Sequence, residues 1–266
     1  MTIDDVGLAR EVADAALELM RAGLPVCASV AAPGTTAIAD ARRLAAAGIP
    51  IGIHVVLTQE KAVAGPSSIT DLSGRFPRRV TGLVARWMKG PFRAADAVAD
   101  ATREIAAQIE MLLDAGVPLG HLDGHEHVHA LPFLANVIPE LAGRYGIRRI
   151  RDVGSLGFIT GRRRATRLLL AWAGRRARSR EAAGQEIPPV RLWGFDVSGR
   201  LDGESLRRIL ENLSPGRNEL ITHPAVSDLT GYSDWGYHWR REFESLLPLA
   251  SSSSSAKRGI RFGPGG

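Results

Sequence analysis

The chain has 266 residues, of which 45% are hydrophobic, and this predicts one large domain with a substantial core rather than two small domains. Its single cysteine, Cys27, excludes an intrachain disulfide and a metal site built from cysteines, so any metal has to be held by His, Asp or Glu. The net charge of +6 permits an anionic partner without establishing one.

The sequence has no segment that predicts a membrane span or a secretion signal. No stretch reaches the roughly 18 uninterrupted apolar residues that a spanning helix needs. The first residues also lack the basic segment followed by an apolar segment that is typical of a secretion signal. We therefore expect a cytoplasmic protein. We expect no nucleic-acid partner, and the sequence leaves the formation of a homo-oligomer open.

Paired carboxylates stand near the amino terminus. Asp4 and Asp5 precede Gly7, and apolar residues then recur with helical spacing over residues 12–20, before Gly23. Two acids before a glycine suggest the tip of a strand that turns into a helix, although almost no strand precedes them. The helix dipole also favours acids at a helix amino terminus, and on these residues alone that is the stronger interpretation.

A short strand with one histidine follows. Residues 25–32 predict a buried strand, residues 36–47 a helix, and residues 49–57 an apolar strand that contains His54. A lone histidine in such a strand is usually a core residue with its hydrogen bonds satisfied. His54, however, lies near the carboxyl end of its strand, where α/β folds keep their sites, and this makes it a candidate site residue.

A long loop and a long helix lead to the most polar part of the chain. Residues 58–79 are rich in Gly, Pro and Ser and are too many for a simple connection, so we expect a loop over the site. Residues 94–113 carry apolar side chains on one face and predict a helix that delivers the chain to the next strand.

Residues 121–129, the histidine run, contain four of the chain's seven histidines. In an extended backbone alternate side chains share one face, here those of His121, Asp123, His125, His127 and His129. Gly124 and nearby prolines argue against a helix, so we expect a strand that runs into a loop. Buried together, these groups need compensation, and a divalent cation is the simplest candidate; an exposed, metal-scavenging tract is the alternative.

The second half of the chain continues the alternation of helices and strands. The expected helices are residues 131–145, 203–212 and 242–249, and the expected strands are residues 148–152, 191–197 and 219–224, the last of which ends at His223 and Pro224. Residues 251–258 predict a flexible segment, and residues 258–266 a frayed terminal strand.

Residues 161–180 form a basic stretch in which arginines surround a short apolar segment. Such a stretch either binds phosphate or an anionic membrane surface, or is a solvated helix. We prefer the solvated helix, because nearly all of the positive charge of the chain is arginine and a nucleotide-composition bias of the source genome also produces this pattern.

Alternating strands and helices without an internal repeat predict an α/β fold, with a mostly parallel sheet that is covered by helices and is either open or closed as a barrel. Asp4 and Asp5, His54, the histidine run and His223 each fall where a strand gives way to a loop. In such folds these points converge on one face.

Taken in series, these segments resemble the YdjC-like carbohydrate deacetylases, a family that includes chitooligosaccharide and hopanoid-associated deacetylases. The matching residues run from Asp4-Asp5-Val6-Gly7-Leu8 through Gly52-Ile53-His54 and the histidine run to Thr222-His223-Pro224, in the family's order. The histidine run is a specific motif, whereas the double Asp and the His-Pro pair are informative only in series. The resemblance implies a single-domain NodB-like distorted (β/α) barrel that removes N-acetyl groups from amino sugars.

The resemblance also implies roles for particular residues. It implies that a divalent metal ion, Mg²⁺ or Zn²⁺, is held by Asp5, His54 and His125. It further implies that Asp4 is the general base and His223 a candidate general acid. The second shell and pocket wall are expected to comprise His121, Asp123, His127 and His129, with Arg148 or Arg151 as a further substrate-binding candidate.

The sequence departs from the family pattern in two places. Only Met1-Thr2-Ile3 precede the double Asp, and Val6 stands where the family has Phe, so we expect either a start assigned too late or a truncated first strand that holds Asp5 loosely. A proline common in the family is missing from residues 148–152, which leaves open whether Arg148 or Arg151 faces the site.

Two other functions stay open on the sequence. Histidine and aspartate clusters at strand ends also serve metal-dependent phosphoester hydrolysis, and residues 161–180 would then bind the phosphate. A degenerate member of the family would bind sugar without turnover.

Overall fold

The computed structural model describes residues 1–88, 91–160 and 190–251. These residues form a seven-stranded sheet in which each strand is parallel to its neighbours, in the order β5-β4-β3-β2-β1-β7-β6. The strands are β1 (Thr2–Val6), β2 (Cys27–Val30), β3 (Ile51–Val55), β4 (His121–Gly124), β5 (Arg149–Ile150), β6 (Val190–Trp193) and β7 (Arg217–Thr222).

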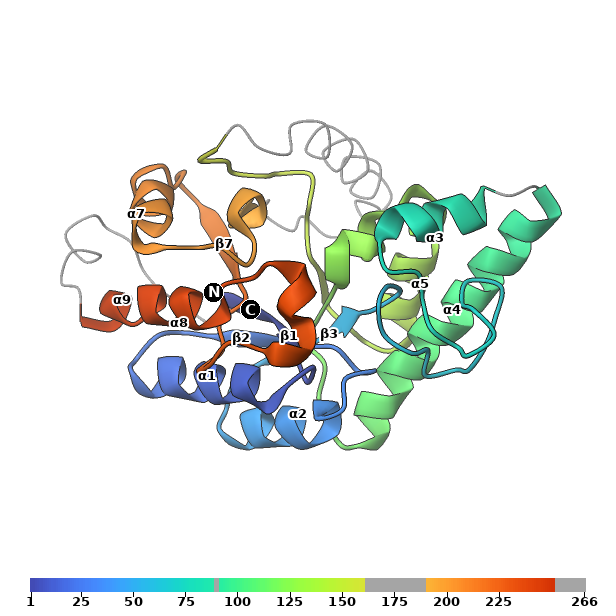
Figure 1. Cartoon of the computed structure of the whole chain (residues 1–266), viewed down its shortest axis with the longest axis horizontal. Helices are drawn as coiled ribbons and strands as arrows, with labels where there is room; N and C mark the ends of the chain where they lie inside the picture. Colours follow the sequence, from blue (N-terminus) through green and yellow to red (C-terminus); the bar gives the residue numbers. More distant parts are fainter. Residues whose placement is uncertain (89–90, 161–189, 252–266) are drawn as a thin grey trace.

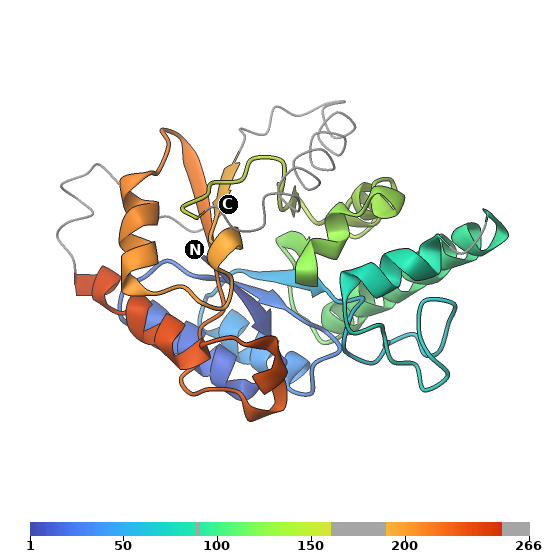
Figure 2. The ribbon, with the colours of Figure 1, turned by 45° about the horizontal axis from the view of Figure 1, so that its top comes forward.

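Helices connect and cover the strands. They are α1 (Arg10–Arg21), α2 (Ala37–Ala46), α3 (Val80–Trp87), α4 (Pro91–Asp114), α5 (Val137–Arg144), α7 (Gly203–Glu211), α8 (Trp239–Leu246) and α9 (Pro248–Ser251). In Figure 1, α1 and α2 lie together along one side of the sheet, and α3, α4 and α5 gather beyond its other end. Figure 2 shows α7 and α8 beside each other, at the opposite end of the molecule from α4.

The sheet curls until its two edges meet at a single bridge. β5 and β6 are the edge strands, and the segment that follows β5 pairs with β6 through Leu156 and Leu192. The amide of Gly157 donates to the carbonyl of Leu192 at 2.7 Å, and the amide of Leu192 donates to the carbonyl of Ser155 at 2.8 Å. The predicted distorted (β/α) barrel is thereby confirmed.

The first strand forms although few residues precede the double Asp. All five residues of β1 are buried, and the strand lies between β2 and β7, with Thr2 opposite both Cys27 and Ile221. Asp5 is 0% exposed. The expectation that Asp5 is held loosely is therefore wrong, because β1 pairs on both sides despite the short lead-in.

Several element boundaries differ from the sequence predictions. Helix α3 was not expected, and α4 and α8 begin earlier than predicted, at Pro91 and Trp239. Residues 195–197, expected as the end of a strand, form a 3-10 turn (Phe195–Val197). Three further 3-10 turns cover His125–Ala130, Pro132–Leu134 and Thr230–Trp235.

Three predicted features lie wholly or largely outside the described residues. The basic stretch at 161–180 and the expected terminal strand at 258–266 are not among them, nor are residues 252–258 of the expected flexible segment. Of the helices that are described, none is both long enough and apolar enough to cross a membrane.

Candidate metal centre

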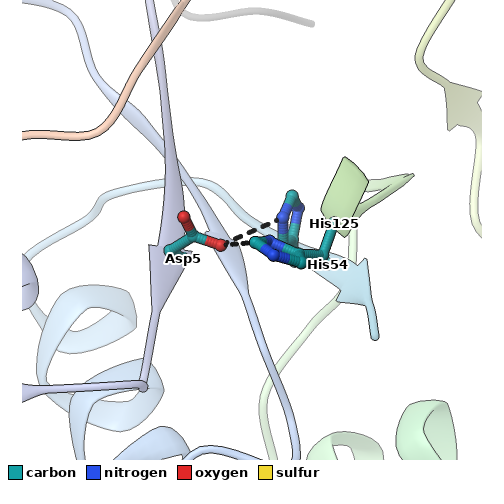
Figure 3. A group of neighbouring side chains, drawn as sticks. All are labelled: Asp5, His54 and His125. Carbon is teal, nitrogen blue, oxygen red and sulfur yellow. Dashed lines mark hydrogen bonds and ion pairs between the residues drawn. The ribbon is translucent and has the colours of Figure 1, made fainter. Parts of the chain in front are cut away.

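Three polar side chains from different strands converge at one end of the sheet. Asp5 lies in β1, His54 near the end of β3, and His125 directly after β4. The Oδ1 atom of Asp5 lies 2.8 Å from Nδ1 of His125 and 3.3 Å from Nε2 of His54. Figure 3 draws both contacts as dashed lines. All three residues are buried, and one possible ligand atom of each lies within 4.8 Å of those of the other two.

The backbone of β1 turns two consecutive carboxylates toward the same region. In a regular strand Asp4 and Asp5 would point to opposite faces. Asp5 instead has a left-handed backbone with φ of 63°, and the pairing of β1 with β2 changes register between Ile3 and Val6. As a result, both carboxylates lie close to His54. A conformation this uncommon for a residue with a side chain is often held at functional sites.

Asp123 orients the imidazole of His54. The Nδ1 atom of His54 lies 2.6 Å from Oδ1 of Asp123, which leaves Nε2 directed toward Asp5. Burial lowers the pKa of His54, but the charges of Asp123 and Asp4 and the hydrogen bonds to Asp123 and Asp5 outweigh burial and raise the pKa to about 10. The carboxylates around His54 therefore stabilise a positive charge that lies between the carboxylate of Asp5 and the imidazole of His54.

His125 is held from two sides. Its Nε2 atom lies 3.3 Å from the side-chain amide of Gln59, which belongs to the loop between β3 and α3. The ring of Trp235 packs on it with 4.7 Å between centroids. The loop that the sequence predicts over the site thus contacts a candidate metal ligand.

The residues of this cluster fit a divalent cation. The Oδ2 atom of Asp5 is buried and has no hydrogen-bond partner in the described part of the chain. Burial raises the pKa of Asp5, but His125 and His54 outweigh burial and lower it well below the ordinary value, so the carboxyl group is ionised. One carboxylate and two imidazoles leave coordination positions open, as in catalytic zinc sites, and a carboxylate with water ligands also suits magnesium.

Arg151 is buried among three carboxylates beside this cluster. Its guanidinium donates to both oxygens of Asp4 at 2.7 Å, contacts Asp123 at 2.6 Å and contacts Glu219 at 3.1 Å. A second group of side chains, Asp4, His54 and Asp123, is also spaced closely enough to hold a cation. The guanidinium of Arg151, however, already supplies positive charge to the carboxylates of Asp4 and Asp123. Arg148 is exposed, so Arg151 is the arginine that reaches the cluster.

His223 follows β7 and is buried beside Glu242 of α8. The carboxylate of Glu242 accepts the backbone N–H of His223 at 2.6 Å, and its oxygen lies 3.8 Å from Nδ1 of the ring. Burial lowers the pKa of His223, but Glu242, with smaller effects of Asp5 and Asp4, raises it above the ordinary value. An imidazole in these surroundings keeps its proton and can give it to a leaving group.

The rest of the histidine run departs from the predicted alternation. The strand ends at Gly124, and left-handed backbone at Glu126 (φ 49°) and His127 (φ 56°) turns the chain. The expectation that the whole run shares one face is therefore wrong beyond His125. His127 packs on Phe195, and His129 lies 3.2 Å from the carbonyl oxygen of Arg151. Burial lowers the pKa of His127 and lowers that of His129 to about 4, so both rings are neutral.

His121 and Asp123 lie in β4, below the candidate metal centre. The Nε2 atom of His121 lies 2.8 Å from the hydroxyl of Ser29, which donates to Asp123 at 2.7 Å. Both residues are at most 4% exposed. Their contacts with Ser29 and His54 fix the position of the cluster, while a direct contact with substrate stays a prediction.

Sequence reasoning missed several side chains that support the cluster. They are Ser29, Gln59, Glu219, Trp235 and Glu242. Ser29 carried a signal, because it is a polar residue inside an otherwise apolar predicted strand, whereas Glu219 is only the first residue of its predicted strand. Gln59, Trp235 and Glu242 carried none, since loop residues and one acid on an amphipathic helix are ordinary.

Comparisons with known proteins agree on one family. The family model described as YdjC-like protein matches residues 1–251. The carbohydrate deacetylase of Geobacillus stearothermophilus is 35% identical over 266 aligned residues, which cover 97% of this chain and 92% of that protein. A carbohydrate deacetylase of Listeria monocytogenes serotype 4a is 37% identical over 115 residues, 42% of this chain and 44% of that protein.

A solved structure supports the fold alone. An Enterococcus faecalis V583 protein assigned to cellobiose-phosphate cleavage matches 99% of this chain and 95% of its own length with a TM-score of 0.69. At 20% sequence identity this similarity concerns the architecture of the barrel and not the reaction.

Proposed function

Since the chain belongs to the YdjC-like family, as predicted from its motifs, we propose that it is a carbohydrate deacetylase that removes the N-acetyl group of an amino sugar by metal-dependent hydrolysis. One observation carries the proposal: Asp5, His54 and His125 gather their ligand atoms around a common point, beside a buried carboxylate and a buried histidine that can handle protons. The relatives' activity supports the same assignment.

The proposed metal ligands are Asp5, His54 and His125, and the ion is Zn²⁺ or Mg²⁺. When bound there, such an ion lowers the pKa of a coordinated water and polarises the acetyl carbonyl. The hydrogen bond from Nδ1 of His54 to Asp123 keeps Nε2 aligned for this role, as a second carboxylate commonly does for a ligating histidine.

Asp4 is the proposed general base. Two parallel hydrogen bonds from Arg151, each of 2.7 Å, fix the plane of its carboxylate, and each oxygen keeps a lone pair for a proton. The carboxylate accepts the proton of the attacking water as the carbon–oxygen bond forms. Arg151 is then a positioning residue for Asp4.

His223 is the proposed general acid. Its Nδ1 side faces Glu242, which leaves Nε2 to give a proton to the departing amine as the carbon–nitrogen bond breaks. Acetate and the free amino sugar are the products. No Ser or Cys nucleophile is needed, because the attacking group is water.

Acetate release tests the proposal. We expect the purified protein with added Zn²⁺ or Mg²⁺ to release acetate from N-acetylglucosamine oligomers, and Asp5→Ala and His125→Ala each to reduce kcat/KM by at least about a hundredfold. His238→Ala is the matched control, because His238 is exposed and its backbone N–H, which alanine retains, bonds Gly199. Unchanged acetate release in both site variants would exclude this metal centre.

The other two functions make different predictions for the same assay. A phosphoester hydrolase would release phosphate from a sugar phosphate and no acetate from the oligomers. A sugar-binding member without catalysis would bind the oligomers saturably and release neither product.

A further inference from the structure

A buried glutamate holds the far end of the Arg151 guanidinium. Both Nη atoms of Arg151 donate to Asp4, and Nη2 also contacts Asp123, so the two aspartates lie at the same end of the planar group. At the other end, the Nε–H donates to Oε1 of Glu219 at 3.1 Å. Glu219 lies in β7 and is 6% exposed. The guanidinium therefore has carboxylate partners at both of its ends.

Glu219 is itself fixed by its neighbours. Its Oε1 atom also accepts the hydroxyl of Thr2 at 2.9 Å, and its Oε2 atom lies 3.7 Å from Nη2 of Arg149. Thr2 belongs to β1, which pairs with β7, and stands two residues before Asp4. Burial raises the pKa of Glu219, but Arg151 and Arg149 outweigh burial and lower the pKa below its ordinary value. The carboxylate is therefore ionised and accepts strong, directional hydrogen bonds.

Charge balance alone does not explain the place of Glu219. The single positive charge of Arg151 already has two carboxylate partners, Asp4 at 2.7 Å and Asp123 at 2.6 Å. A third buried carboxylate adds a further charge that has to be removed from water. Glu219 adds direction, because the guanidinium is planar and its N–H groups are fixed relative to one another. A partner on the Nε–H prevents this plane from tilting about its contacts with the aspartates.

We propose that Glu219 is a positioning residue, which fixes the orientation of Arg151 and through it the carboxylate of Asp4 that accepts the proton of the attacking water. The inference rests on the proposed function, because it takes Asp4 as the general base. Proton transfer depends on the distance and direction of the accepting oxygen. Loss of Glu219 therefore slows the chemical step and leaves the binding of metal and substrate as it was.

Two substitutions of Glu219 separate positioning from charge. Glu219→Met keeps the length of the side chain without an acceptor, whereas Glu219→Gln keeps one oxygen for the Nε–H of Arg151 and for the hydroxyl of Thr2. With N-acetylglucosamine oligomers and added Zn²⁺, we expect Glu219→Met to lower kcat for acetate release at least about tenfold, and Glu219→Gln to keep at least about a third of it. Unchanged kcat in Glu219→Met, or an equal loss in both variants, would overturn the inference.

Two further quantities separate positioning from general support of the fold. The KM of Glu219→Met and its Zn²⁺ affinity, measured by titration calorimetry, should each stay within about twofold of wild type. A raised KM together with weaker Zn²⁺ binding would overturn the positioning role. The matched control is Asp40→Leu, because Asp40 is a buried carboxylate that pairs with Arg43 at 2.9 Å on α2, outside the barrel. It should lower the urea midpoint without lowering kcat.

A double-mutant cycle tests whether Glu219 acts through Asp4. In the Asp4→Asn background, Glu219→Met should cost less than about twofold more, because the base that Arg151 orients is already absent. A further tenfold loss would overturn the inference. Should circular dichroism show Glu219→Met to be unfolded, Thr2→Val replaces it, since it removes only one of the hydroxyl and guanidinium contacts of Glu219. We then expect kcat to fall about threefold, and unchanged kcat would contradict the inference.

An NMR measurement decides on the inference even if wild type releases no acetate, a result that would count against the proposed function. The Nε–H signal of Arg151 is assigned by its absence in Arg151→Met, and its exchange with solvent is followed. We expect exchange at least about tenfold faster in Glu219→Met than in wild type, and close to the wild-type rate in Glu219→Gln. Equal exchange in wild type and Glu219→Met would show that Glu219 does not hold Arg151.

Discussion

At the residue scale, Glu242 controls the protonation of His223. Because the pKa of His223 is raised in the folded protein, the ring keeps its proton to a higher pH than a free histidine, and activity that needs this proton falls as the pH rises through the raised value. Glu242→Gln keeps the acceptor for the backbone N–H of His223 but removes the charge. We expect the alkaline limb of the kcat/KM profile to move to lower pH.

The pH profile has a matched control on the same helix. Glu244 is exposed and, within the described part of the chain, pairs with the exposed Arg240 at 2.8 Å, so Glu244→Gln should leave the alkaline limb where it is. An identical profile in wild type and Glu242→Gln would show that His223 does not donate the proton in the reaction.

Removal of the buried Arg151 should cost the protein stability. It is 3% exposed and compensates Asp4, Asp123 and Glu219, so Arg151→Met leaves buried carboxylates without their counter-charge. Breaking such a buried pair costs about 3–5 kcal/mol of unfolding free energy, which urea denaturation measures. Arg207→Met removes an arginine that also pairs with two acids but on the surface, and should leave the unfolding free energy almost unchanged.

Some site residues could be predicted from the sequence and others could not, for a physical reason. His54 was a candidate because it lies near the end of an apolar run, and His125 because it belongs to the histidine run, whereas Asp5 was identified as a ligand only through the family resemblance. The left-handed backbone of Asp5, which brings it beside Asp4, depends on pairing with β2 and β7 and leaves no local pattern. Glu242 acts on His223 across 19 residues of chain, and single-sequence patterns do not report such contacts.

At the element scale, helix α4 holds the loop that contacts His125. The buried carboxylate of Glu104 accepts the amides of Val63 and Ala64 at 2.9 and 2.7 Å. Glu104→Ala removes both acceptors, so we expect faster amide hydrogen exchange over residues 58–79 and a severalfold lower kcat/KM for acetate release. Glu110→Ala, on the exposed side of the same helix, should change neither; equal exchange in wild type and Glu104→Ala would contradict the anchoring role.

The contact between β3 and β4 depends on a glycine. Gly52 pairs with His121, and a Cβ atom at Gly52 would lie 2.3 Å from the His121 ring. Gly52→Ala should therefore displace His121, lower the unfolding free energy by about 1–3 kcal/mol and weaken Zn²⁺ binding, since His121 contacts Ser29 and Ser29 bonds Asp123. A Cβ atom at Gly143 in α5 would meet no atom of the described residues within 4 Å, so Gly143→Ala should be neutral or slightly stabilising in the same unfolding and calorimetric measurements.

Strands were easier to predict than turns in this chain. Buried parallel strands are continuous apolar runs, which is how residues 25–32 and 49–57 were identified as β2 and β3. Helix α3 was missed because it buries only Leu83 and so lacks a wide apolar face. The sequence predicted that the strand runs into a loop after His121, but not the sharp turn, because left-handed backbone at Glu126 and His127 is unusual for such residues.

At the scale of the whole molecule, closure of the barrel depends on contacts between distant segments. The bridge from Leu156 to Leu192 joins parts of the chain that are separated by the residues around 161–189, and Asp196 accepts the amides of Ile159 and Thr160 at 3.1 and 2.6 Å. The sequence therefore predicted an open sheet or a barrel without distinguishing them from its residues, and only the family resemblance favoured the barrel.

The proposed metal centre also couples metal binding to folding of the whole chain. Its ligands come from β1, β3 and the segment after β4, so the site exists only when the central sheet is formed. A ligand that binds only the folded protein adds about 2.7 kcal/mol at a hundred times its dissociation constant. We therefore expect Zn²⁺ to raise the melting temperature by several degrees and EDTA to reverse the rise.

The rise in melting temperature on Zn²⁺ binding should shrink as the pH falls, because protons compete for the same imidazole and carboxylate atoms. Asp5→Asn should abolish the shift while Asp71→Asn, in the exposed part of the loop, should keep it, and an equal rise in wild type and Asp5→Asn would mean that Zn²⁺ binds elsewhere.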